Sequence, residues 1–185
     1  MRAKGIFAKT YGAGTEALER RFLLRELPLG LSLGDTHFQV TENYVTGTPV
    51  CLVKLRLPET REVSWHLEKR EPDERPRSAR VVYQNIDLDE YEYEALSVFE
   101  ANELRYNRYP FDYEGWKYAV DVYLGPLWGL ILAWTSFTSE EESESFELPT
   151  FAVLEVTRDE MFAASKLVEL SADDIRRELA RRADK

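Results

Sequence analysis

The segment from Glu16 to Pro28 carries charged side chains at even intervals along an apolar stretch. Arg21 follows Glu19 by two positions, and Arg25 follows Arg21 by four. Because successive side chains of a β-strand point to opposite faces, this spacing puts the three charges on one face of a strand. That face can be the solvated side of an open sheet, or it can line the interior of a closed barrel.

Other short segments of the chain also have the composition and the periodicity of strands. In the segment Val50–Leu57, polar and apolar residues alternate so that Lys54 and Arg56 share one face. Glycine and proline separate many of these segments. Strands are predicted at residues 17–26, 36–45, 48–58, 61–70, 79–86, 104–111, 117–125, 129–137 and 151–157.

Helical signals are concentrated in the C-terminal third of the chain. Ser139 is predicted to cap a short helix with an acidic first turn, and helices are predicted at residues 158–170 and 171–185. The segment 88–104 begins like a strand and ends like a short helix, and its pattern leaves both structures open. About eight strands without a regular strand–helix alternation indicate an α+β fold with one large antiparallel sheet or barrel.

Length and charge restrict the class of protein. The 185 residues predict a single domain, residues 1–185, with a loose lead-in or an edge segment over residues 1–15 and a polar loop over residues 70–78. The net charge of −10 argues against non-specific binding to nucleic acid or to anionic membranes. The single Cys51 suggests a reducing compartment, and no apolar run is long enough to span a bilayer. A cytoplasmic protein without a membrane or nucleic-acid partner is therefore expected.

Several familiar motifs are absent from the sequence. It contains no P-loop, no dinucleotide-binding glycine pattern and no Cys/His cluster with zinc spacing. The only histidines, His37 and His66, have no obvious nucleophile beside them, and both are interpreted as ordinary, partly exposed side chains. Cys51 lies in an apolar strand and is interpreted as a buried structural thiol.

Mixed acidic and basic residues on alternating strand faces suit a complex of a polyphosphate with a divalent metal. Carboxylates hold Mg²⁺ or Mn²⁺, while arginine and lysine neutralise phosphate oxygens. The competing interpretation is a solvated sheet face with cross-strand ion pairs, which the alternation taken alone favours.

The ordered series of segments resembles the CYTH family of triphosphate tunnel metalloenzymes. The opening E-x-E-x-K strand of this family corresponds to ALERRFLL, and its R-I-R-type strand corresponds to VKLRL. Its R-x-E-x-E, K-x-R-Y and W-x-V-D-V strands correspond to EYEYE, YNRY and WKYAVDVYLGPLWGL, and its closing E-V-T motif to PTFAVLEVT. The resemblance covers about residues 15–170, and residues 171–185 add a C-terminal helix.

This resemblance implies an antiparallel, eight-stranded β-barrel around a polar tunnel, with short flanking helices. Members of the family bind triphosphates in the tunnel with a divalent metal, Mg²⁺ or Mn²⁺. They include inorganic and thiamine triphosphatases and a class of adenylate cyclase. Carried over by position, the phosphate-binding residues are Arg21, Lys54, Arg56, Arg108 and Lys166, and the metal-binding residues are Glu19, Asp121, Glu92 and Glu94.

The departures from the family pattern weigh against metal-dependent hydrolysis. Ala17, Trp134 and Ser136 stand where the family has glutamates. The sequence therefore predicts a tunnel domain that binds a triphosphate, a polyphosphate or another phosphorylated anion, with catalysis in doubt. The first alternative is a metal-dependent triphosphatase or an adenylate cyclase-like enzyme. The second is a partner-binding protein with a filled barrel.

Overall fold

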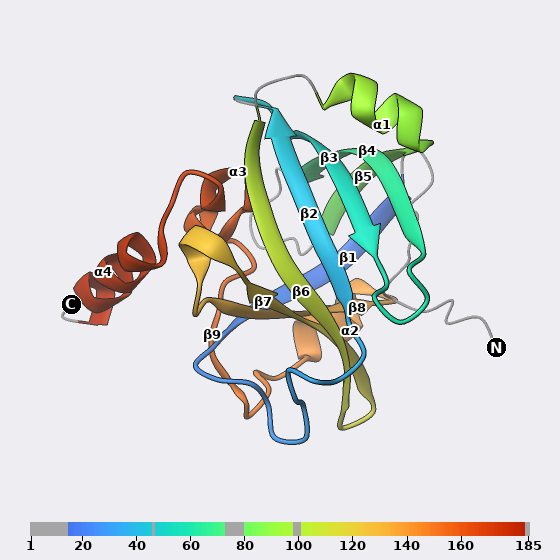
Figure 1. Ribbon diagram of the computed structural model, residues 1–185. Helices are drawn as coiled ribbons and strands as arrows, with labels where there is room; N and C mark the ends of the chain where they lie inside the picture. The colour runs from blue at the N-terminus through green and yellow to red at the C-terminus, as the bar shows by residue number, and fades with distance from the viewer. Residues whose placement is uncertain (1–14, 46, 73–79, 98–100, 184–185) are drawn as a thin grey trace.

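Eight antiparallel strands form a closed barrel in the computed structural model, which describes residues 15–45, 47–72, 80–97 and 101–183 (Figure 1). A ninth strand lies outside the ring. The strands are β1 (Thr15–Leu24), β2 (Phe38–Val45), β3 (Val50–Arg56), β4 (Val63–Pro72), β5 (Arg80–Leu88), β6 (Ala101–Tyr113), β7 (Trp116–Tyr123), β8 (Ile131–Phe137) and β9 (Ala152–Glu155).

Strand β1 closes the barrel because it pairs with different strands along its length. Around the ring the order is β1-β5-β4-β3-β2-β6-β7-β8, and β8 returns to β1. The first part of β1 pairs with β5, where Glu16 lies opposite Val82, and the later part pairs with β8, where Phe22 lies opposite Ala133. The predicted α+β fold with an eight-stranded antiparallel barrel is therefore confirmed.

Short helices flank the barrel (Figure 1). Helix α1 packs against β4 and β5, and α3 and α4 follow β9 at the C-terminal end of the described chain. The helices are α1 (Glu90–Leu96), α2 (Glu140–Ser145), α3 (Ala164–Leu167) and α4 (Ala172–Ala183), with 3-10 turns η2 (Gly125–Leu127) and η3 (Glu160–Phe162).

Local capping explains where α1 and α2 begin. The Asp89 side chain accepts the backbone N–H of Glu92, whose own carboxylate accepts the N–H of Asp89. This capping box fixes the ambiguous segment 88–104 as a helix followed by β6. Ser139 caps α2 as predicted. The single helix predicted over residues 158–170 is wrong, because Ala163 is extended (φ −65°, ψ 135°) and separates η3 from α3.

Two apolar clusters hold these elements together. One combines barrel residues such as Val40 and Leu104 with Phe162, Leu167 and Ile175, so the C-terminal helices are packed onto the barrel. The other consists of residues of β1, β6, β7 and β8 and is rich in aromatic rings. Burying a large apolar side chain contributes roughly 1.5–3 kcal/mol, so these contacts fix the positions of the strands that carry the charged interior.

Two predicted segments fall mainly outside the described residues. They are the lead-in over residues 1–15, of which only Thr15 is described, and the loop over residues 70–78, described only to Pro72. Among the helices of the described chain, none combines the length and the apolar composition that a bilayer crossing requires.

Candidate functional site

A polar cavity of about 280 Å³ lies inside the barrel. Among the described residues that line it are four carboxylates and three guanidinium groups, so its charges nearly balance. Its polar and charged lining residues are Glu19, Arg21, Glu42, Ser64, His66, Glu68, Arg70, Tyr83, Asn85, Tyr106, Arg108, Asp121 and Tyr123.

A chain of hydrogen bonds connects β7 to β2 through β6. The Arg108 guanidinium holds Asp121 in a bidentate pair, with Nε to Oδ1 at 2.7 Å and Nη2 to Oδ2 at 2.8 Å. The same guanidinium donates to the Tyr106 hydroxyl at 3.1 Å, and that hydroxyl donates to Glu42 Oε1 at 2.8 Å. The indole of Trp134 lies 5.0 Å from the Arg108 guanidinium, at cation–π distance.

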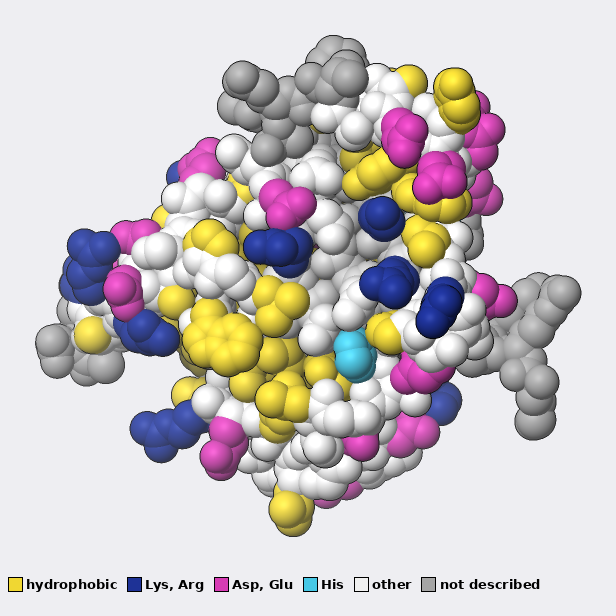
Figure 2. All heavy atoms as spheres, in the orientation of Figure 1, with side chains coloured by type: hydrophobic (Ala, Val, Ile, Leu, Met, Phe, Trp, Pro, Cys, Tyr) yellow, Lys and Arg dark blue, Asp and Glu magenta, His cyan; other side chains and the backbone are white. Residues whose placement is uncertain are grey.

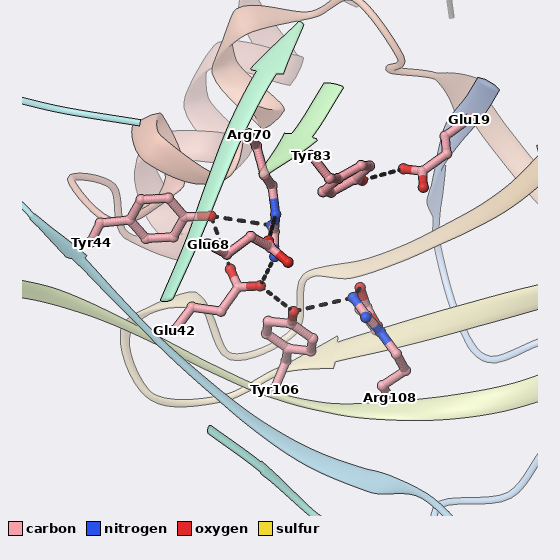
Figure 3. Close-up of polar contacts among 9 residues, drawn as sticks. Glu19, Glu42, Tyr44, Glu68, Arg70, Tyr83, Tyr106 and Arg108 are labelled. Carbon is pink, nitrogen blue, oxygen red and sulfur yellow. Dashed lines mark hydrogen bonds and ion pairs between the residues drawn. The ribbon is translucent and has the colours of Figure 1, made fainter. Parts of the chain in front are cut away.

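Arg70 on β4 extends this chain to two further groups. Its Nη2 pairs with Glu42 Oε1 at 2.5 Å, its Nε bonds Glu68, and its Nη1 donates to the Tyr44 hydroxyl at 3.2 Å. Figure 3 shows these side chains converging inside the barrel. Together these side chains form the interior network: Glu42, Tyr44, Glu68, Arg70, Tyr106, Arg108 and Asp121.

The charges of the interior network stabilise one another. Burial alone would raise the pKa of Glu42, but the neighbouring Arg70 outweighs it and holds that pKa below its ordinary value. Burial alone would lower the pKa values of Arg70 and Arg108, and their carboxylate partners raise both instead. Burial raises the pKa of Tyr106. At neutral pH the network therefore consists of charged pairs joined by neutral phenols that donate hydrogen bonds.

Arg21 on β1 differs from the other two cavity arginines. Its side chain is half-buried and lines the cavity. Across the described part of the chain, its guanidinium makes no hydrogen bond or ion pair, whereas its backbone is engaged: its N–H donates to Thr157 Oγ1 and its carbonyl accepts the N–H of Val156. Burial would lower the pKa of Arg21, but Tyr83 and Glu19 nearby leave it raised. Arg21 is thus a charged group whose donors are available to an anion.

Glu19 lies two residues before Arg21 on the same strand. Its buried carboxylate accepts a hydrogen bond from the Tyr83 hydroxyl at 2.7 Å, a pair that Figure 3 shows apart from the interior network. A second hollow of about 420 Å³, bordered by residues 156–165, shares Glu19, Arg21 and Arg70 with the first. These three side chains therefore line both hollows.

The structure brings four of the predicted site residues together. Glu19, Arg21, Arg108 and Asp121 all line the cavity. They come from β1, β6 and β7, and their side chains point into the barrel, as the resemblance to the tunnel family implies.

The structure places the two predicted basic residues of β3 elsewhere. Val53 and Leu55 line the cavity, so Lys54 and Arg56, which alternate with them, lie on the opposite face of the strand. Arg56 is exposed and donates to Gln39 Oε1 at 3.4 Å. Figure 2 shows Lys and Arg side chains on the outer surface over β3. The expectation that these two side chains face the tunnel is therefore wrong.

The remaining predicted site residues lie on helices. Glu92 and Glu94 are exposed residues of α1, where Figure 2 shows carboxylates gathered at the surface. The strand match that suggested them is wrong because the capping box makes this segment helical. Lys166 is an exposed residue of α3 that pairs with Glu169. None of these three lines the 280 Å³ cavity.

Three charged residues of the cavity were not predicted from the sequence. They are Glu42, Glu68 and Arg70. A signal for them exists, because Val40, Glu42 and Tyr44 alternate on β2, and His66, Glu68 and Arg70 alternate on β4. Deciding which face of each strand points inward required the register of the closed barrel.

The described carboxylates do not form a metal centre. Over residues 15–45, 47–72, 80–97 and 101–183, no group of three His, Cys, Asp or Glu side chains is placed to hold a metal ion. Asp121 is held by Arg108, and Glu42 and Glu68 are held by Arg70. Where glutamates were expected, Ala17 is buried against Tyr83 and Trp134 occupies the cavity wall.

Comparisons with known proteins support the fold. No family model and no curated protein matches the chain. The solved structure of "the inorganic triphosphatase NE1496" matches with a TM-score of 0.56 and 23% identity, covering 85% of this chain and 97% of that one. A second structure, of "the hypothetical protein NE1496", matches with a TM-score of 0.56 and 22% identity, covering 84% and 99%. At these identities the likeness shows the fold alone, and it agrees with the CYTH-like tunnel barrel that the sequence resembles.

Proposed function

We propose that this protein binds a small, phosphate-bearing anion in the barrel cavity. The observation that carries the proposal is the Arg21 guanidinium, which lines the cavity and makes no hydrogen bond or ion pair with a described residue. Glu19 nearby supplies negative charge but no contact to the guanidinium donors, and a phosphate oxygen would supply both charge and acceptors. The neighbouring Arg70 and Arg108 add positive potential, although each is already paired with a carboxylate.

The size of the cavity favours an inorganic polyphosphate over a nucleotide. Sites for drug-sized ligands usually enclose about 300–1,000 Å³, and this cavity encloses about 280 Å³. A nucleoside triphosphate would have to place its base outside this cavity, in the adjoining hollow of about 420 Å³. An open cavity lined by seven charged side chains also argues against a filled barrel. The triphosphatase named among the structural neighbours supports tripolyphosphate as the first ligand to test.

Hydrolysis of the bound anion by a protein-held metal is the weaker alternative. It is supported by Glu19 and Asp121, which line the same cavity, but Asp121 is held in a bidentate pair by Arg108. The binding proposal needs no metal held by the protein. A divalent cation would instead arrive as part of the ligand, bound by phosphate oxygens.

Thermal denaturation with a series of anions tests the proposal. Orthophosphate, diphosphate, tripolyphosphate and ATP are compared, each with and without Mg²⁺. A ligand that binds only the folded state raises the melting temperature, and we expect the largest rise with tripolyphosphate. Arg21→Met should reduce the rise strongly, whereas Arg56→Met, which removes a guanidinium outside the cavity, should retain it. No rise at millimolar tripolyphosphate, or an equal rise in Arg21→Met, would overturn the proposal.

A further inference from the structure

Three side chains at the edge of the cavity form a hydrogen-bonded relay. His66 Nδ1 lies 3.0 Å from Asp87 Oδ1, and His66 Nε2 lies 3.2 Å from Ser64 Oγ. Each ring nitrogen thus has one partner, a carboxylate on one side and a hydroxyl on the other. The pattern is a nucleophile, a base and a carboxylate that orients the base, the order of roles found in serine hydrolases of unrelated folds.

The barrel itself creates this arrangement. Ser64 and His66 are two residues apart on β4 and therefore share a strand face. The β4–β5 register places Asp87 directly opposite His66. Ser64 and His66 line the cavity, while the Asp87 side chain is 72% exposed, so the relay runs from the cavity to solvent. No sequence motif marks these residues, because the third comes from another strand.

The carboxylate selects the tautomer that the chemistry needs. A carboxylate only accepts hydrogen bonds, so Asp87 favours the tautomer with the proton on Nδ1. Nε2 then carries the lone pair that accepts the Ser64 hydroxyl proton. In this state His66 is a neutral base in contact with a potential nucleophile.

We propose that Ser64 is a nucleophile, activated by His66, that accepts a phosphoryl group from the anion in the cavity. This proposal rests on the proposed function, since the cavity must first hold a phosphoric anhydride. Ser64 Oγ bonds to the terminal phosphorus, the bridging P–O bond breaks, and the serine proton passes through His66 Nε2 to the departing diphosphate. In the second step water, deprotonated by His66, attacks phosphoserine; orthophosphate leaves and the proton returns to Ser64. Asp87 is a positioning residue for His66.

Covalent labelling by a small dialkyl fluorophosphonate tests the relay independently of the natural ligand. An activated serine displaces fluoride and keeps the phosphorus, so peptide mapping by mass spectrometry identifies the residue. We expect Ser64 to be labelled in the native protein, with His66→Gln slowing the reaction by about 10²–10⁴-fold. Ser136→Ala, which removes a serine of β8 for which no histidine contact is described, serves as the control and should react at the wild-type rate.

A substitution of the exposed Asp87 tests the relay even if His66→Gln fails to fold. Asp87→Asn should slow labelling more than about tenfold at an unchanged melting temperature, because the favoured tautomer is lost. Asp87→Glu should recover part of the rate. A merely structural hydrogen bond would move the melting temperature and leave labelling unchanged. No labelling of Ser64 in the folded wild type, or equal rates in wild type and Asp87→Asn, would overturn the proposal.

Turnover of tripolyphosphate separates this proposal from the binding proposal. With EDTA present, wild type should release orthophosphate and show phosphoserine at Ser64 after acid quenching. Ser64→Ala should lose both and still show the tripolyphosphate-induced rise in melting temperature. A rise without release or phosphoserine in the wild type overturns the relay and leaves the binding site intact. Labelling of Ser64 without any rise in melting temperature refutes the phosphate ligand, and with it the phosphoryl step assigned to Ser64.

Discussion

Replacing Arg70 with methionine should destabilise the protein strongly. Arg70 pairs with Glu42 and Glu68, and the Glu42 side chain is only 1% exposed. Removing one partner of a buried pair leaves an uncompensated charge and costs about 3–5 kcal/mol. For a chain of this length, 1 kcal/mol corresponds to roughly 2–4 °C, so the melting temperature should fall by roughly 6–20 °C.

The same reasoning predicts how this loss depends on pH and on a second substitution. Without Arg70, burial raises the pKa of Glu42, so acidification neutralises the carboxylate and narrows the gap between variant and wild type. The double variant Arg70→Met/Glu42→Gln should be more stable than Arg70→Met at neutral pH, because one of the two stranded charges is gone.

Urea denaturation followed by circular dichroism measures these differences, and Arg56→Met is the matched control. Arg56 is exposed and makes no described ion pair, so its replacement should change the free energy of unfolding by less than about 0.5 kcal/mol. If Arg70→Met also costs less than about 1 kcal/mol, the value of an exposed pair, the interior network is solvated and this account of its energetics is wrong.

Three further predictions concern single buried groups. The free energy of unfolding of the wild type should fall as the pH drops below about 4.5, the ordinary pKa of a glutamate. The reason is that a carboxyl with a lowered pKa in the folded state loses its stabilising effect as the pH falls through that pKa. Urea titrations of Glu42→Gln should show a flatter dependence of this free energy on pH. Trp134→Ala should cost about 3–5 kcal/mol by thermal denaturation and admit larger phosphate ligands, because Trp134 is buried and lines the cavity. Cys51 is fully buried and burial raises its pKa, so a thiol reagent should modify it only at the rate of unfolding; rapid modification of the native protein would contradict this.

Much of the fold could be predicted because polar and apolar residues alternate along the individual strands. Alternation located the strands of the barrel, and the resemblance to the tunnel family then identified charges on β1, β6 and β7 that face inward. Helix α1 was harder, since its glutamates and tyrosines alternate like a strand. The Asp89–Glu92 capping box decided the structure, and a D-x-x-E pattern for it stands in the sequence.

The inward face of a strand could not be read from that strand alone. On β3 both faces are partly apolar, and the charges of Lys54 and Arg56 suggested the wrong one. Register decides the matter, since Val53 lies between Glu42 on β2 and His66 on β4, both of which line the cavity. The same limit concealed the relay, because Asp87 meets His66 only through the pairing of β4 with β5.

Isothermal titration calorimetry with tripolyphosphate tests the central claim most directly. We predict one ligand per chain in the wild type and in Arg56→Met. In Arg21→Met, losing a charged hydrogen bond worth about 1.5–3 kcal/mol should weaken binding roughly 10- to 150-fold. Equal affinities in wild type and Arg21→Met, or a loss in Arg56→Met alone, would contradict a ligand held in the barrel cavity by Arg21.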